Sequence, residues 1–100
     1  MAIAVIEKQG TVLTVRPQGR VDTVRTPLLD RELQPYLDGV QLIVMDFSGV
    51  EYISSAGLRV LLSAHKAMSA KGGMKVKNVN EIVQEVFEVT GFADILTIES

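Results

Sequence analysis

The sequence contains no cysteine, a single histidine and few aromatic residues, and these absences exclude several kinds of protein. Without cysteine there is no disulfide bond, no thiolate metal site and no cysteine nucleophile. No basic leader precedes the apolar stretch in residues 1–10, and that stretch is too short for a signal peptide or a membrane-spanning helix. We therefore expect a cytoplasmic protein.

An excess of one charge is also lacking. Ten Lys and Arg residues against twelve Asp and Glu residues give a formal net charge of −2, which offers no general attraction to nucleic acid or to an anionic membrane. A length of 100 residues with 47% hydrophobic and 22% charged residues is typical of one ordinary globular domain with a single core. We expect one domain that folds alone, with neither nucleic acid nor membrane as its partner.

The first part of the chain predicts a hairpin followed by a helix. Residues 3–8 and 11–16 are rich in β-branched side chains and are separated by a turn that contains glycine, which is typical of two paired strands. Thr26 followed by Pro27 predicts a helix with Thr26 as its cap. Pro35 removes a hydrogen bond and clashes one turn back, so we expect a kink or a break there.

The rest of the chain predicts alternating strands and helices. Residues 41–47, QLIVMDF, contain four consecutive apolar side chains, as in a central parallel strand covered on both faces. The elements expected after it are a helix from residue 55 to the glycines at 72 and 73, a strand at 74–79, a helix between Asn80 and Gly91, and a short strand at 95–98. This order predicts an α/β fold with a mixed β-sheet of about four to five strands and helices packed against it.

The segment DFSGVEYISSAGL, residues 46–58, places two adjacent serines where a buried strand gives way to a helix. The first turn of a helix leaves backbone N–H groups unpaired, and together with the helix dipole they favour negative charge. A phosphoserine would be tolerated there, and it would change the local charge by about −1.5 to −2. A change of that size is enough to make or break an interface.

A serine between a strand and a helix is also the local geometry of the nucleophile elbow of α/β-hydrolases. That elbow has glycine two residues on each side of the serine, but Ser55 has Gly57 after it and Ile53 before it. The single histidine, His65, follows ten residues later on the same predicted helix, roughly 15 Å away along the axis. Because that is far outside hydrogen-bond reach, a hydrolase triad is excluded.

Carboxylates offer no better support for a metal enzyme. Asp22, Asp46 and Glu51 are residue types that bind Mg²⁺. The chain has no GxxxxGK loop to hold the phosphates of a substrate. We predict neither a metal site nor a cofactor.

Helix capping is the simplest role for the serine pair, because serine caps well and contributes about 1 kcal/mol. Capping, however, needs only one of Ser54 and Ser55. Ala56 and Gly57 keep the approach to the second hydroxyl unhindered. Such a floor of small residues suits close docking of another protein or of a nucleotide phosphate.

The run DFSGVEYISSAGLRVLL, residues 46–62, resembles the signature of the STAS domain. GRVD at residues 19–22 resembles the family's motif after the second strand, and VTGF at 89–92 resembles its end-of-helix turn. The resemblance extends over residues 1–100, so we expect a single STAS domain. The whole chain is similar to a stand-alone anti-sigma factor antagonist.

This resemblance implies partner switching without enzyme activity. The unphosphorylated antagonist would bind an anti-sigma factor that is also an ATP-dependent serine kinase, and phosphorylation would end the complex until a PP2C-type phosphatase reverses it. The family's phosphorylated residue corresponds to Ser55. The resemblance also implies two sets of residues around it. Ser54, Asp22 and Gly57 would support the acceptor site. The partner would be bound by Thr23, Ala56, Leu58 and Arg59.

The signature departs from the family pattern at two positions. Ser54 occupies the place of an acidic residue, and Ala56 occupies the place of a second hydroxyl. Either Ser54 or Asp22 would then orient the acceptor, or the loss of a negative neighbour would ease repulsion of the phosphate. The alternative is a STAS subunit that never cycles, in a lipid transporter or a signalling scaffold.

Overall fold

A five-stranded mixed sheet forms the centre of the computed structural model, which describes residues 4–22 and 26–99. In spatial order its strands are β1 (Ala4–Gln9), β2 (Val12–Pro17), β4 (Leu42–Asp46), β6 (Met74–Lys77) and β7 (Thr97–Glu99). The β1–β2 hairpin is antiparallel and every later pair in this sheet is parallel. The predicted hairpin and the predicted α/β fold with a mixed sheet are confirmed.

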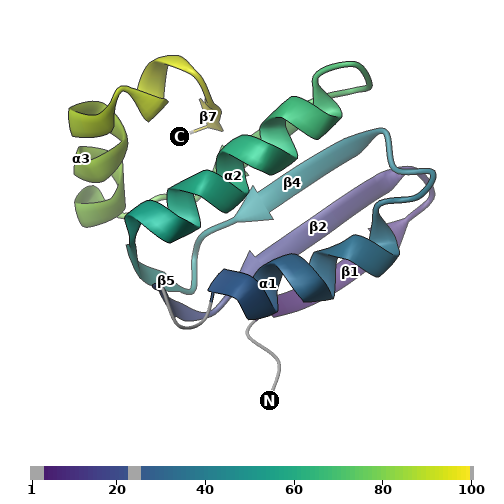
Figure 1. The fold of residues 1–100 in the computed structure, drawn as a ribbon, viewed down its shortest axis with the longest axis horizontal. Coiled ribbons are helices and arrows are strands. Elements are labelled where there is room, and N and C mark those ends of the chain that lie inside the picture. The colour runs from purple at the N-terminus through teal and green to yellow at the C-terminus, as the bar shows by residue number, and fades with distance from the viewer. Residues whose placement is uncertain (1–3, 23–25, 100) are drawn as a thin grey trace.

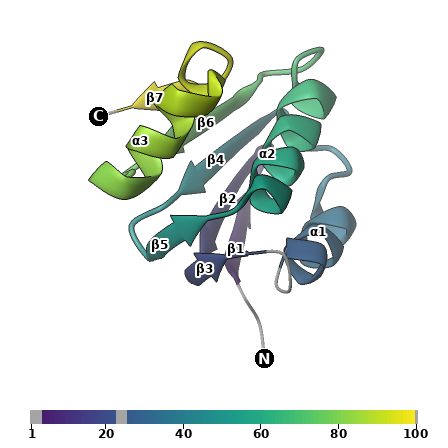
Figure 2. The ribbon, with the colours of Figure 1, turned by 60° about the vertical axis from the view of Figure 1, so that its left-hand side comes forward.

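Two helices cover one face of this sheet. Helices α1 (Thr26–Leu33) and α2 (Ser55–Met68) lie side by side across β2 and β4, as Figures 1 and 2 both show. Their inward side chains join those of the strands in one buried core, which includes Leu29, Leu33, Leu61, Met68, Leu13, Val15, Ile43, Met45 and Val76. Within the described residues, no helix combines the length and the apolar character needed to cross a membrane.

Strand β4 is the centre of the sheet, as predicted, but it is not covered equally on both faces. Ile43 and Met45 are fully buried, whereas Leu42 and Val44 are half-buried. The difference arises because α1 and α2 both cover the same face of the sheet (Figure 2), and Ile43 and Met45 belong to the core that these helices form with it. The continuous apolar run therefore predicted the position of the strand correctly, but its prediction that both faces are buried was wrong.

Helix α1 ends near the predicted break. It stops at Leu33, and a 3₁₀ turn, η1 (Gln34–Tyr36), carries Pro35. The prediction for Thr26 was wrong, because this residue is the first of α1 and its hydroxyl donates to the carbonyl oxygen of Asp22 at 2.6 Å. Thr26 thus ties the start of α1 to the chain before it instead of accepting from a helical N–H group.

Two short strands were not predicted from the sequence patterns. Strands β3 (Gly19–Val21) and β5 (Val50–Ile53) pair with each other in parallel as a separate two-stranded sheet. Helix α3 (Glu81–Thr90) lies beside β5 at the end of the molecule where β4 finishes, and a 3₁₀ turn, η2 (Phe92–Asp94), follows it (Figure 1). The final strand, β7, begins two residues later than predicted.

Candidate functional site

The predicted site lies where β3 and β5 end together. Val21 is the register partner of Ile53, so Asp22 and Ser54 are the residues that follow a pair of parallel strands at the same edge. The backbone N–H of Ser54 donates to the carbonyl oxygen of Val21 at 2.8 Å. The structure therefore brings together Asp22 and Ser54, which are separated by more than thirty residues in the chain.

Ser54 caps helix α2. Its backbone is extended, its side-chain oxygen accepts from the N–H of Gly57 at 3.3 Å, and its carbonyl accepts from the N–H of Leu58 at 2.9 Å. These bonds satisfy backbone groups that the first turn of a helix otherwise leaves unpaired. Of the two serines, Ser54 is the one whose oxygen is committed to the fold.

Gly57 allows the first turn of α2 to lie directly on the two short strands. A β-carbon at this position would lie 2.7 Å from Cγ1 of Ile53, 2.9 Å from Cγ1 of Val21 and 2.9 Å from the carbonyl oxygen of Val21. Since these separations are well inside ordinary contact distance, no larger residue fits without displacing the helix. Gly57 thereby fixes the height of the serine pair above β3 and β5.

Ser55 is the first residue of α2 and is exposed. Within the described residues its hydroxyl takes part in no hydrogen bond, and the first turn of α2 contains no acidic residue. The dipole of the helix and the free N–H groups of its first turn favour negative charge at this point. The hydroxyl is therefore open to a partner and lies in a field that stabilises an added phosphate.

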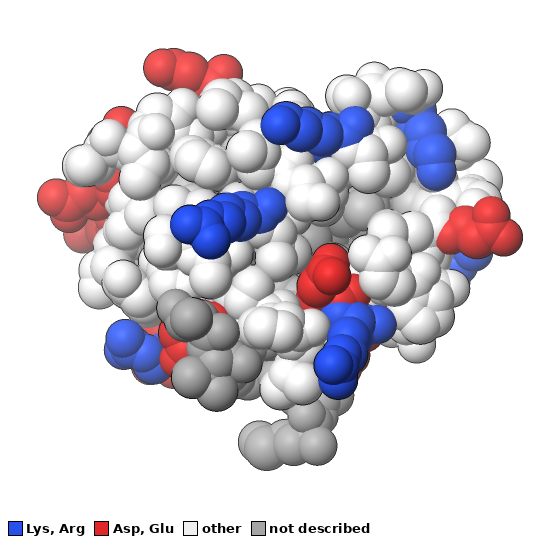
Figure 3. All heavy atoms as spheres, viewed as in Figure 1, with Lys and Arg blue, Asp and Glu red and all other residues white. Residues whose placement is uncertain are grey.

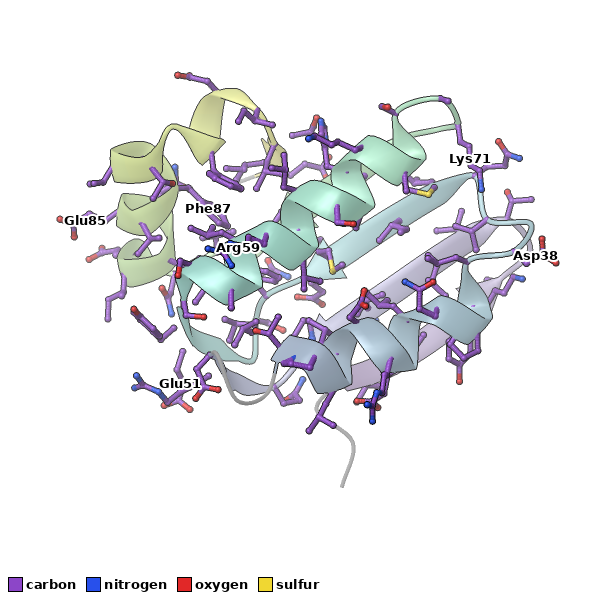
Figure 4. All side chains as sticks on the ribbon, viewed as in Figure 1. Asp38, Glu51, Arg59, Lys71, Glu85 and Phe87 are labelled. Atoms are coloured by element: carbon purple, nitrogen blue, oxygen red, sulfur yellow. The ribbon has the colours of Figure 1, made fainter. Side chains whose placement is uncertain are left out.

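The predicted partner-binding residues are divided between surface and core. Arg59 is exposed one turn beyond Ser55 and forms no ion pair with any described residue (Figure 4). Ala56 is half-buried, while Leu58 is only 5% exposed and belongs to the hydrophobic core. Leu58 thus holds the helix from beneath, and Thr23 lies outside the described residues.

Asp22 connects the site to α1. Its carbonyl oxygen accepts from both the N–H and the hydroxyl of Thr26, at 2.9 and 2.6 Å. The residue itself is half-buried. Since Asp22 also follows the strand that pairs with β5, the starts of α1 and α2 are held near one another by the same short sheet.

The carboxylate of Asp46 holds the turn that leads to the site. It accepts from Nδ2 of Asn78 at 2.9 Å, from the N–H of Ser48 at 3.0 Å and from Nε of Arg16 at 3.3 Å. The hydrogen bond from Asn78, with smaller contributions from Ser48 and the charge of Lys77, lowers the pKa of Asp46 to about 2 despite its burial. A carboxylate held in this way stabilises the turn after β4.

Asn80 joins the site to α3. Its Oδ1 accepts from the N–H of Val83 at 2.8 Å and so caps α3, as predicted. Its Nδ2 donates to the carbonyl oxygens of Val50 and Glu51, at 3.0 and 3.3 Å. The cap was visible in the sequence, but the anchoring of β5 was not, because β5 itself has no local signal.

Comparison with known proteins agrees with this architecture. The family model of the STAS domain matches residues 3–100. The chain belongs to the STAS domain family. Among its relatives, the chain is 37% identical over 95 residues to BtrV of Bordetella bronchiseptica, named as a candidate anti-sigma factor antagonist, with 93% of this chain and 82% of the relative covered.

Further similarity is to proteins of the same kind. The anti-sigma-B factor antagonist of Bacillus subtilis is 28% identical over 96 residues, which cover 95% of this chain and 88% of the relative. The structure of the anti-sigma factor antagonist SpoIIAA in its unphosphorylated form superposes with a TM-score of 0.81 at 17% identity, covering 97% of this STAS chain and 88% of that one. The phosphorylated form of Bacillus SpoIIAA gives a TM-score of 0.73 at 16% identity, covering 97% and 91%. Together these comparisons group the chain with the anti-sigma factor antagonists.

Proposed function

We propose that this STAS domain is an anti-sigma factor antagonist that binds an anti-sigma factor with serine kinase activity and is released when Ser55 is phosphorylated. The observation that carries the proposal is the state of Ser55, which is exposed and free of hydrogen bonds within the described residues at the start of α2. The names of two relatives support the antagonist role, and a phosphorylated form of Bacillus SpoIIAA supports the switch.

In the unphosphorylated state the docking surface is a neutral hydroxyl on a small-residue floor. Ser55 and Ala56 let a partner approach the helix closely, and the exposed cation of Arg59 lies at the edge of this surface. Asp22 lies at its other edge, beside the cap of α2. A kinase that binds here places its nucleotide next to the hydroxyl that it modifies.

Phosphorylation ends the complex through local charge. The phosphate adds about −1.5 to −2 charges, and a poorly solvated, unpaired charge at an interface costs several kcal/mol. A cost of about 2 to 4 kcal/mol corresponds to binding that is roughly 25-fold to 700-fold weaker. No rearrangement of the fold is needed, because the start of α2 already favours negative charge.

The chain itself is the substrate and the binding module in this cycle. The chemistry belongs to two partners, the ATP-dependent kinase and a PP2C-type phosphatase that removes the phosphate. Ser54 is spared in this proposal because its side-chain oxygen already caps α2. We place the cycle in the cytoplasm, where ATP and the sigma factor are found.

The decisive experiment is co-expression with an anti-sigma factor kinase from the same organism, followed by measurement of the intact mass and mapping of the modified residue. One phosphate on Ser55 is expected in the wild type and in Ser54→Ala, and none in Ser55→Ala. Ser55→Asp is expected to remain folded and to lose kinase binding, whereas Ser55→Ala keeps it. A wild type that binds its kinase tightly yet never gains mass refutes the switch and leaves a STAS subunit that does not cycle.

A further inference from the structure

Helix α3 is apolar on two sides, although only one side packs against the protein. Val83 and Phe87 are fully buried, and Phe87 points toward the body of the molecule, where it meets Phe47 (Figure 4). On the outward side, Ile82 is 59% exposed and Val89 is 80% exposed, with half-buried Val86 between them. We name Ile82, Val86 and Val89 the α3 stripe.

The α3 stripe has the spacing of a helix-binding surface. Its members stand at positions i, i+4 and i+7, so they form one row along the helix. Together with Glu85 and Thr90 they line a shallow hollow of about 280 Å³. A row of this kind receives apolar side chains from another helix laid along it.

The charged residues of α3 are all of one sign. Glu81, Glu85 and Glu88 border it, and α3 carries no basic residue. Residues 78–100 contain five acidic and no basic residues, a net charge of −5, so the remaining seven acidic and ten basic residues give residues 1–77 a net charge of +3. Figure 3 shows this separation, with only red and white over α3 and blue spread across the middle of the face.

These carboxylates have no cation to offset them within the described part of the chain. None of its ion pairs includes a residue of α3. Glu81 and Glu85 repel at positions i and i+4, and Glu88 lies near the carboxyl end of the helix, where the dipole disfavours an anion. A cationic partner would relieve both effects while it covers the exposed apolar row.

The sign of the charge excludes the two simplest occupants. A second copy that met α3 with α3 in a two-fold contact would place glutamates against glutamates. An anionic membrane surface would be repelled for the same reason. The complementary surface is apolar along one side and rich in Lys and Arg along its borders.

We propose that the α3 stripe is a docking site for a basic amphipathic helix of a partner protein. The stripe includes neither Ser55 nor Arg59, so binding there does not depend on the phosphorylation state of Ser55. Asn80 joins α3 to β5, which leads into Ser54 and α2, so this partner would be held next to the switch. The antagonist would thus hold a second partner through both halves of its cycle.

A synthetic amphipathic helix of about five turns, with Leu on one face and Lys on the other, tests the proposal on the ¹⁵N-labelled full chain. Amide shifts are expected to be largest in residues 81–90. Val89→Ser and Glu85→Lys are each expected to weaken binding about tenfold or more. The matched control is Leu28→Ser, because Leu28 is an apolar residue of α1 with 43% exposure and should leave binding unchanged.

Further measurements distinguish a basic helix from a second copy of the chain and from a lipid surface. The same peptide with Gln in place of Lys is expected to bind weakly, and Ser55→Asp is expected to bind the Lys peptide as the wild type does. Shifts centred away from residues 81–90, or equal binding to Val89→Ser and Leu28→Ser, overturn the proposal. Self-association of the wild type that Val89→Ser abolishes, or binding to phosphatidylcholine vesicles that Val89→Ser abolishes, assigns the stripe to a different occupant and also overturns it.

Discussion

The substitution Gly57→Ala tests whether the height of the serine pair is set by one missing side chain. The new methyl group would lie 2.7 and 2.9 Å from side-chain carbons of Ile53 and Val21, and 2.9 Å from the carbonyl oxygen of Val21. Side-chain carbons can yield, but the carbonyl belongs to β3 and accepts from the N–H of Ser54. The helix must therefore move by about half an ångström to reach ordinary contact distance.

Two opposing effects determine the size of the change. Overpacking of this kind costs about 1 to 3 kcal/mol, whereas alanine is better than glycine in a helix by about 1 kcal/mol. We expect the free energy of unfolding to fall by about 1 kcal/mol, and a shift of the first turn that slows phosphorylation of Ser55. If the site were unhindered, Gly57→Ala would instead raise the free energy of unfolding, because only the higher helix propensity of alanine would act.

Urea unfolding measures the first effect, and the rate of kinase-dependent phosphorylation measures the second. For a chain of this size, the expected loss of unfolding free energy lowers the urea midpoint by up to about 1 M. Ser63→Ala, at an exposed position of the same helix, is the control; it should raise the free energy of unfolding by no more than about 0.5 kcal/mol and leave the phosphorylation rate unchanged. A Gly57→Ala protein that is more stable than the wild type and is phosphorylated at the same rate refutes the packing argument.

Three further substitutions test the groups that surround the site. The folded pKa of Asp46 lies at about 2, below its ordinary value of 3.8, so its ionisation stabilises the fold above about pH 4 and this contribution is lost as the pH falls from 4 to 2. Urea unfolding at several pH values measures this contribution. The free energy of unfolding of the wild type should exceed that of Asp46→Asn by about 2 kcal/mol near neutral pH, and the difference should vanish near pH 2. A difference that does not change with pH contradicts this expectation. Ser54→Ala should lower the free energy of unfolding by about 1 kcal/mol, because it removes the cap of α2. Ser54→Asp should leave it nearly unchanged, because Asp caps a helix as well as Ser does. Equal losses in both variants would show that the cap contributes nothing. Asn80→Ala should lower the free energy of unfolding by about 2 kcal/mol, because it removes a cap and two hydrogen bonds to β5. The control Glu85→Ala, at an exposed position of the same helix, should lower it by less than about 0.5 kcal/mol, and similar losses in the two variants would contradict the anchoring role.

Local patterns were sufficient where neighbours in the sequence decide the structure. The hairpin follows from β-branched runs around a glycine turn, and the break near Pro35 follows from the missing N–H of proline. Ser54 and Asn80 cap their helices because a short polar side chain reaches an N–H group three residues later. Such interactions need no knowledge of the rest of the chain.

Strands β3 and β5 could not be predicted in the same way. They span three and four residues, and each is a strand only because it pairs with the other across some thirty residues. Thr26 was misassigned for a different reason, since its hydroxyl donates to the carbonyl oxygen of Asp22, four residues earlier, where the capping pattern predicts an acceptor. The burial of Leu58 likewise depends on the strands beneath α2.

By itself the sequence determined that a capped helix begins at the serine pair, because capping and helical spacing are local, and it determined the family through its signature. Only the tertiary structure decided that Asp22 lies beside Ser54, that Gly57 holds α2 on β3 and β5, and that the hydroxyl of Ser55 forms no hydrogen bond with any described residue. It also left Ile82 and Val89 outside the core, although their side chains are as apolar as those within it. The physical reason is that pairing and burial join distant residues, and local propensity carries no information about them.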